Sequence, residues 1–349
     1  LVDLQKNPKF NSLVFDLRGN GGGLLEESVQ ILNLFVKKGE LLVTQKGKTE
    51  GANAVYYAKN DPIAPDIRVA VLVDKNSASA SEITAGNFQD LDRGVVIGQR
   101  SYGKGLVQQT RPLTFNSQMK LTVAKYFTAS GRCVQTKIYH HTNDDGEAVS
   151  EVPDSLMKPF KTKNGRTVFD GSAVYPDRYV DLGDTSNIAK SLSRNLIIFD
   201  YATRYRQAHA SIDSVPQFRY SDAEYADFIN YVSGRSYNYS TNSERAFASL
   251  KETAQREKYY AGISNELEAL GKELTHDKRA DLDLFKSEIK TLIEKELVVR
   301  YYFETGKYKY MFANDPIMKE ALTVLGNVSL YNSILKGEGN YKVIGKPKG

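Results

Sequence analysis

The chain has 349 residues, 41% hydrophobic and 26% charged, which is the composition of an ordinary globular protein with room for two domains. Its formal net charge of +5 comes from scattered rather than clustered basic residues, which favours a solvated surface over a nucleic-acid or membrane patch. The single cysteine, Cys133, excludes an internal disulfide and disfavours a cysteine-rich metal site, and no apolar run is long enough to span a bilayer.

Short apolar runs alternate with helical patterns in the first half of the sequence. Leu24 to Lys37 carries apolar residues at three- and four-residue spacing, which predicts a helix, and Ala80 to Leu91 predicts a second helix. Strands are predicted at residues 13–17, 41–44, 54–57, 67–73, 95–97, 106–112 and 119–127, the last two joined by a turn near Asn116. Strands that alternate with helices predict an α/β core.

The pattern becomes helical after Asp184. Ser221 to Glu224 is a capping-box pattern before an apolar helical face, and Asp315-Pro316 is typical of a helix start. This half is rich in tyrosine and carries no chemical motif. We therefore predict two domains, residues 1–178 and residues 179–349, with the second mostly helical. Because Leu1 to Gln5 looks like the end of a helix, we expect a longer protein of which this sequence is a piece.

The stretch Asn76 to Glu82 joins a predicted buried strand to a predicted helix. A small-residue elbow of this kind exposes a hydroxyl at a helix N-terminus, where free N–H groups and the helix dipole favour negative charge. Three serines compete for the role of nucleophile: Ser77, Ser79 and Ser81. Residue chemistry alone does not rank them.

A serine is a weak nucleophile until a base takes its proton, and Lys104 is the candidate base. A lysine amine acts as a base only when neutral, and the uncharged neighbours of Lys104 favour that form. In an extended segment Lys104 and Gln108 point to the same side, so the Gln108 oxygen can accept a hydrogen bond from the lysine amine. Four histidines remain as alternatives that this scheme does not need: His140, His141, His209 and His276.

A tetrahedral intermediate needs two backbone N–H donors. Ala80, directly after Ser79, supplies one. The other is expected from the turn Gly21 to Gly23, where absent side chains let the backbone approach closely, and Gly22 is favoured although the sequence does not separate it from its neighbours. Asp16 and Arg18, just upstream, are interpreted as braces of this turn.

Five short motifs follow one another along the chain: Asp16-Leu17-Arg18, Ser77 to Glu82, Tyr102-Gly103-Lys104-Gly105, Val107-Gln108-Gln109 and Thr128 to Arg132. In this order they resemble the C-terminal processing peptidases, also called tail-specific proteases, over roughly half of the chain. The resemblance implies a crotonase-like (ClpP/crotonase-type) protease core. It also implies a catalytic triad with Ser79 as nucleophile, Lys104 as base and Gln108 as the third member. Ser77 is then expected to cap the helix, and Ser81 to pack in its first turn. The resemblance also implies a PDZ domain ahead of the core.

The leading hypothesis is a serine endopeptidase with a Ser79/Lys104 dyad and an acyl-enzyme intermediate, acting near the C-termini of proteins or peptides. We expect no cofactor, no metal and no nucleic-acid partner. The sequence does not decide whether the protein forms a homo-oligomer. The resemblance implies the periplasm or cell envelope of a bacterium. The alternatives are a catalytically silent peptide-binding or scaffold relative, and an esterase or acyl-CoA enzyme on a related fold.

Overall fold

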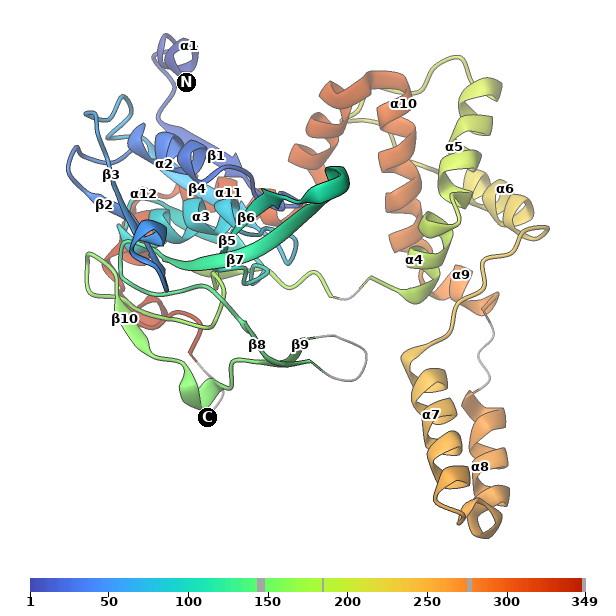
Figure 1. Cartoon of the computed structure of the whole chain (residues 1–349). Coiled ribbons are helices and arrows are strands. Elements are labelled where there is room, and N and C mark those ends of the chain that lie inside the picture. Colours follow the sequence, from blue (N-terminus) through green and yellow to red (C-terminus); the bar gives the residue numbers. More distant parts are fainter. Residues whose placement is uncertain (143–147, 184, 275–277, 347–349) are drawn as a thin grey trace. The chain divides into compact units, whose positions relative to one another are not determined.

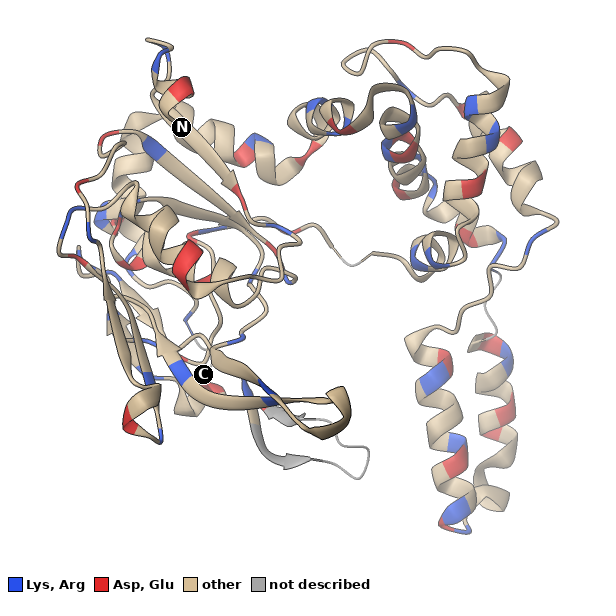
Figure 2. Ribbon diagram, turned by 45° about the horizontal axis from the view of Figure 1, so that its top comes forward, with Lys and Arg blue, Asp and Glu red and all other residues tan. Residues whose placement is uncertain are grey.

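The computed structural model describes residues 1–142, 148–183, 185–274 and 278–346 (Figure 1). The chain forms two compact units: unit 1 comprises Leu1–Asp181 and Pro316–Gly349, and unit 2 comprises Leu182–Asp315. Lys and Arg residues, in blue, and Asp and Glu residues, in red, are interspersed along the ribbon of both units (Figure 2). This agrees with the scattered charge predicted from the sequence.

The first sheet of unit 1 is parallel, with strand order β1-β4-β5-β12. Its strands are β1 (Ser12–Asp16), β4 (Arg68–Val73), β5 (Val95–Gly98) and β12 (Arg178–Tyr179). The helices of unit 1 are α1 (Val2–Gln5), α2 (Leu25–Asn33), α3 (Ala80–Asp90), α11 (Pro316–Gly326) and α12 (Val328–Lys336). The predicted α/β core is confirmed, because α2 follows β1 and α3 connects the neighbouring parallel strands β4 and β5.

Strand β4 is buried on both faces, which is the usual state of a strand in a parallel sheet. Val69, Val71 and Val73 pack into a cluster with side chains of α2 and α3. The alternate residues Ala70 and Leu72 pack into a second cluster with side chains of α11 and α12. The site at the end of β4 is therefore built on a strand that helices hold from both sides.

The position of α11 and α12 differs from the predicted boundary, which placed residues 316–349 in the helical domain. In the structure these helices belong to unit 1. The Tyr331 hydroxyl accepts a hydrogen bond from Val69 N at 3.0 Å, and Arg178 forms an ion pair with Glu320 at 2.6 Å. The apolar face of α11 matches the sheet surface that α2 and α3 leave open. Such a contact between distant segments leaves no local trace in the sequence.

The second large sheet is antiparallel, with strand order β3-β2-β7-β6. Its strands are β2 (Leu41–Gly47), β3 (Ala54–Tyr57), β6 (Leu106–Pro112) and β7 (Gln118–Phe127). The predicted hairpin of β6 and β7 is confirmed, with a register shift between Val107 and Gln108. Among the described strands β6 pairs with β7 only, so it forms an edge of this sheet. The remaining pairs are β8 (Lys137–Thr142) with β9 (Ala148–Glu151), and β10 (Pro159–Lys161) with β11 (Thr167–Phe169).

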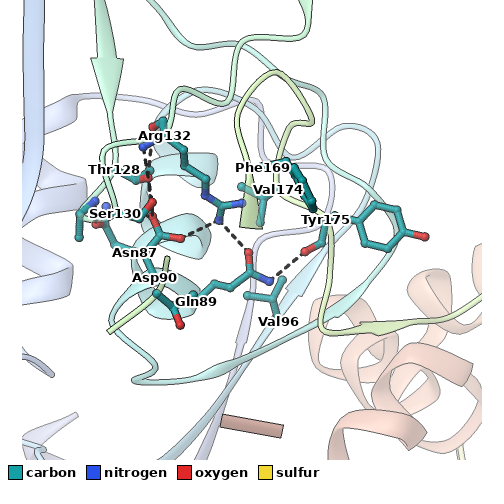
Figure 3. Close-up of polar contacts among 12 residues, drawn as sticks. Asn87, Gln89, Asp90, Val96, Thr128, Ser130, Arg132, Phe169, Val174 and Tyr175 are labelled. Carbon is teal, nitrogen blue, oxygen red and sulfur yellow. Dashed lines mark hydrogen bonds and ion pairs between the residues drawn. The ribbon is translucent and has the colours of Figure 1, made fainter. Parts of the chain in front are cut away.

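A buried ionic network anchors the C-terminal end of α3 (Figure 3). Arg132 pairs with Asp90 at 2.8 Å, with both side chains almost fully buried, and also donates to Gln89 Oε1 at 2.7 Å. Asp90 accepts further hydrogen bonds from the hydroxyls of Thr128 and Ser130. Removing one partner of a buried pair of this kind typically costs about 3–5 kcal/mol. The network therefore ties α3, whose other end carries Ser79, to the segment 128–132.

Unit 2 is helical, as predicted. Its helices are α4 (Asn187–Arg194), α5 (Ile197–Ala208), α6 (Asp222–Val232), α7 (Asn242–Arg256), α8 (Tyr260–Leu274), α9 (Ala280–Leu284) and α10 (Lys286–Asn314). The predicted capping box at the start of α6 is confirmed, since Ser221 and Glu224 exchange side-chain to backbone hydrogen bonds. Tyrosines such as Tyr201 and Tyr220 pack in the core of this unit. Within the described ranges, no helix combines the length and apolarity needed to cross a membrane.

Candidate active site

Ser79 lies at the elbow between β4 and α3. It is the N-cap residue of α3 and has a φ of 58°, a value that few residues other than glycine adopt. Such strain is typical of functional turns, where the surrounding structure holds a side chain in a fixed direction. Ala80, the first residue of α3, has no acceptor for its N–H within the helix. The elbow therefore presents the Ser79 hydroxyl beside a backbone N–H that has no acceptor within the helix.

The other two serines of the elbow have structural roles. Ser77 is buried; its hydroxyl donates to Leu17 O at 2.8 Å and accepts from Asp74 N at 2.9 Å. The prediction that Ser77 caps the helix is wrong, because α3 begins later and Ser79 is its N-cap residue. Ser81 is buried in the first turn of α3. Of the three serines, only Ser79 borders the cleft described below.

The glycine turn after β1 lies against the elbow. Arg18 braces the turn by donating two hydrogen bonds to the Asp16 carboxylate, from Nε at 2.9 Å and from Nη2 at 2.7 Å. Ala78 N of the elbow donates to Asn20 O of the turn at 3.0 Å. Gly22 has a φ of 101°, and a Cβ added there would lie 2.8 Å from Ser79 Cβ. Only glycine allows this approach of backbone to backbone. The Gly22 N–H itself donates to Asn20 Oδ1 at 2.9 Å.

We expect Gly22→Ala to lower any rate that depends on the Ser79 hydroxyl by at least about 100-fold, because a shift of the elbow by a fraction of an ångström displaces that hydroxyl. Gly21→Ala is the matched control, since no atom lies within 4 Å of a Cβ added at Gly21. Steady-state kinetics of both variants, with their melting temperatures, would test this expectation. Equal activity of the two variants would contradict the close packing of Gly22 on Ser79.

A cleft of about 410 Å³ opens beside the elbow. We call it the Ser79 cleft. Ser79, Ala80, Lys104 and Gln108 all border it, although they come from two separate stretches of the chain, 79–80 and 104–108. Its apolar wall includes Leu24, Leu25, Tyr56, Ile83, Leu106 and Val107. Gly22 borders a neighbouring hollow that also contacts Ala80.

Lys104 precedes β6, and Gln108 follows the register shift in that strand. The simple two-residue alternation that the sequence suggested therefore does not hold between these positions. Lys104 is partly buried and Gln108 is exposed. In the described part of the chain, no hydrogen bond joins the Lys104 amine to Gln108 or to Ser79. The structure thus gathers the predicted residues around one cleft without forming the predicted bond.

Sequence reasoning missed the role of Glu82, one turn into α3. Its side chain is fully buried, and its carboxylate accepts hydrogen bonds from Ser79 N, Ser101 Oγ, Gly103 N and Lys104 N. Burial raises the pKa of Glu82, and these four hydrogen bonds act in the opposite direction. A capping-box glutamate is a sequence signal for the contact with Ser79 N, but nothing local indicates the contacts with residues 101–104.

Tyr126, on β7, was also missed. Its side chain is buried and borders the Ser79 cleft, where its hydroxyl donates to Lys104 O. Burial raises the pKa of Tyr126 well above its ordinary value, so the hydroxyl stays protonated. Ser79, Lys104, Glu82 and Tyr126 therefore form one connected polar cluster.

The histidines do not enter this cluster where they are described. His209 belongs to unit 2, where its ring stacks on Tyr205 with centroids 4.0 Å apart. The side chains of His140 and His141, and the whole of His276, lie outside the described residues. Among the residues that the structure does describe, no group of three or more His, Cys, Asp and Glu side chains is arranged to hold a metal ion.

A serine at a strained strand-to-helix elbow, a lysine on the same cleft and a glycine turn packed on the serine define an α/β protein with a candidate Ser/Lys acyl-transfer site. Residues 1–144 match the family model described as peptidase family S41. Residues 188–325 match the family model described as probable PDZ-protease, C-terminal helical domain.

Two curated bacterial relatives illustrate the similarity. The carboxy-terminal-processing protease of Bartonella bacilliformis is 40% identical over 127 residues, which are 36% of this chain and 29% of the relative. The probable CtpA-like serine protease of Staphylococcus haemolyticus is 34% identical over 193 residues, which are 54% of this chain and 35% of the relative. The chain thus spans about a third of the length of these relatives. A solved photosystem II D1 C-terminal processing protease is 28% identical over 52% of this chain and 36% of its own, with a TM-score of 0.37.

Proposed function

We propose that this chain carries the catalytic core of a serine endopeptidase that cleaves proteins or peptides near their C-termini through a Ser79/Lys104 dyad. The observation that carries this proposal is the Ser79 cleft, which Ser79, Ala80 and Lys104 border together. The match of residues 1–144 to a peptidase family model and the names of the bacterial relatives support the reaction class. The preference for C-termini rests on those names and on the sequence resemblance.

In the proposed reaction the neutral Lys104 amine takes the proton of Ser79 Oγ as the oxygen attacks the substrate carbonyl. The lysine then gives that proton to the departing amine of the substrate. A water molecule, deprotonated by Lys104, hydrolyses the resulting ester and restores Ser79. Gln108 is the proposed orienting partner of Lys104, although no hydrogen bond joins the two side chains among the residues that the structure describes.

Two backbone N–H groups are proposed to stabilise the oxyanion of the tetrahedral intermediate. Ala80 N–H, at the start of α3, is one of them. Gly22 remains our proposal for the other, because its backbone packs directly on Ser79 and Ala80. Its N–H donates to Asn20 Oδ1 in this structure, so the role requires that bond to be exchanged for the oxyanion.

The edge strand β6 supports a peptide substrate over a small ester. Val107, Gln108 and Gln109 of this strand border the Ser79 cleft, so an extended peptide can add to the edge while its scissile bond approaches Ser79. We also propose a crotonase-like arrangement for the core and a location in the periplasm or cell envelope of a bacterium. An encoded precursor without an export signal would contradict that location.

Hydrolysis of peptides with free C-termini, compared with hydrolysis of small esters, tests the function. Both assays are combined with covalent labelling by a fluorophosphonate, which reacts with activated serines. An endopeptidase cleaves internal peptide bonds and is labelled at Ser79. A silent peptide-binding relative shows neither property, and an esterase turns over esters only. Either of the last two results would overturn the proposed function.

A further inference from the structure

Glu82 connects the two halves of the candidate dyad through a single carboxylate. Its Oε2 atom accepts from Ser79 N at 3.0 Å and from Lys104 N at 2.8 Å. Its Oε1 atom accepts from Ser101 Oγ at 2.5 Å and from Gly103 N at 2.7 Å. Nucleophile and base belong to different segments, so this carboxylate is a direct polar link between their backbones.

The hydrogen-bond partners of Glu82 call for its ionised form. Three of the four are backbone N–H groups, which can only donate. The fourth, Ser101 Oγ, accepts from Val174 N at 2.8 Å and directs its own proton to Glu82. A proton on Glu82 would displace at least one of these donors and would remove the charge that makes the others strong. The site is therefore built around a buried anion.

We propose that ionised Glu82 is a positioning residue, which sets the distance between Ser79 and Lys104 by holding both backbones on one oxygen atom. This inference rests on the proposed function. Glu82 does not touch the substrate, because its side chain is fully buried beneath the elbow. It acts through the two residues that it holds.

The proposal predicts a second protonation step on the acid side of the pH profile. Burial raises the pKa of Glu82, so it takes up a proton at a higher pH than an ordinary glutamate. The titratable groups that face it are the Tyr126 hydroxyl and the Cys133 thiol, and burial raises the pKa of each, so both remain uncharged where Glu82 titrates. Activity is then present above the Glu82 midpoint and is lost as the pH falls through it, in addition to the loss caused by protonation of the lysine base.

Glu82→Gln is the first test, since it keeps the size of the side chain and replaces one acceptor by a donor that faces N–H groups. We expect kcat to fall by at least about 100-fold, with KM changed by less than about threefold, because ground-state binding does not involve Glu82. Glu82→Asp keeps the charge and should restore part of kcat. A Glu82→Gln enzyme with kcat within threefold of the wild type would overturn the proposal.

Ser101→Ala gives a second readout in case Glu82→Gln does not fold. It removes a donor that lowers the pKa of Glu82, so the lower break in the plot of log kcat/KM against pH should move to higher pH while the upper break stays in place. Ser172→Ala is the matched control, because it removes another buried serine hydroxyl, bonded to Phe169 O, and should leave both breaks unchanged.

The wild-type enzyme separates the two claims. An active wild type with a single break, or a Ser101→Ala profile identical to that of the wild type, would overturn the role of Glu82 and leave the proposed function standing. An inactive wild type would overturn both. Two breaks in the wild type, of which only the lower moves in Ser101→Ala, would support the positioning role, since a general loss of stability does not move one break alone.

Discussion

Ser79→Ala should lower kcat/KM for peptide hydrolysis by at least about 10³-fold, because no acyl-enzyme can form without the hydroxyl. The variant should remain folded. Its backbone N–H can still donate to Glu82, and the strained turn is held by the bonds of its neighbours. Steady-state kinetics on a peptide substrate and labelling by a fluorophosphonate would measure the loss, and a circular dichroism melting curve would check the fold.

Ser81→Ala is the matched control for this result. Ser81 is two residues further along the elbow, buried in the first turn of α3 and away from the Ser79 cleft. Its replacement should keep the rate within a few-fold of the wild type. If Ser79→Ala kept its activity while Ser81→Ala or Ser77→Ala lost it, the wrong serine would have been chosen.

Lys104→Arg should be as inactive as Lys104→Ala, a loss on the order of 10³-fold or more. Arginine stays protonated in proteins and cannot accept the Ser79 proton, although it preserves the positive charge. For the same reason the wild-type rate should rise with pH as the lysine amine loses its proton. Profiles of kcat/KM between about pH 5 and 10, for the wild type and both variants, would measure these effects.

Two further measurements sharpen this test. Gln108→Ala should have a milder effect than either lysine variant, because Gln108 is proposed to orient the amine rather than to accept the proton. A chelator should leave the rate unchanged. Substantial activity in Lys104→Arg, or full inhibition by the chelator, would rule out the Ser/Lys mechanism and return the histidines to consideration.

Much of the catalytic half could be predicted because its signals are local. The apolar run at 67–73, the small residues of the elbow and the helical pattern that follows lie within one stretch of about 25 residues, so they predict β4, the turn and α3 together. In the fold Ser79, Lys104 and Gln108 border one cleft. The Gly22 turn was predictable as a close backbone approach because glycine is the residue that permits it.

Other features depended on the tertiary structure. Asp315-Pro316 indicated the start of α11 but not its packing partner, and in the fold α11 and α12 cover β4 within unit 1. The predicted contact between Lys104 and Gln108 assumed regular strand alternation, which the register shift in β6 interrupts. A bulge of this kind depends on the pairing with β7 and not on β6 alone.

The sequence by itself determined the class of the fold, the order of its elements and the chemical groups of the site, because periodicity, turn residues and side-chain chemistry are properties of short segments. Only the tertiary structure decided how the charges are satisfied. In sequence Glu82 is an acidic residue in the first turn of a predicted helix, yet in the fold it is a buried anion that accepts four hydrogen bonds, two of them from the backbones of Ser79 and Lys104. Three of those bonds come from residues 101–104, and only the packing of that segment on α3 brings these donors to the carboxylate.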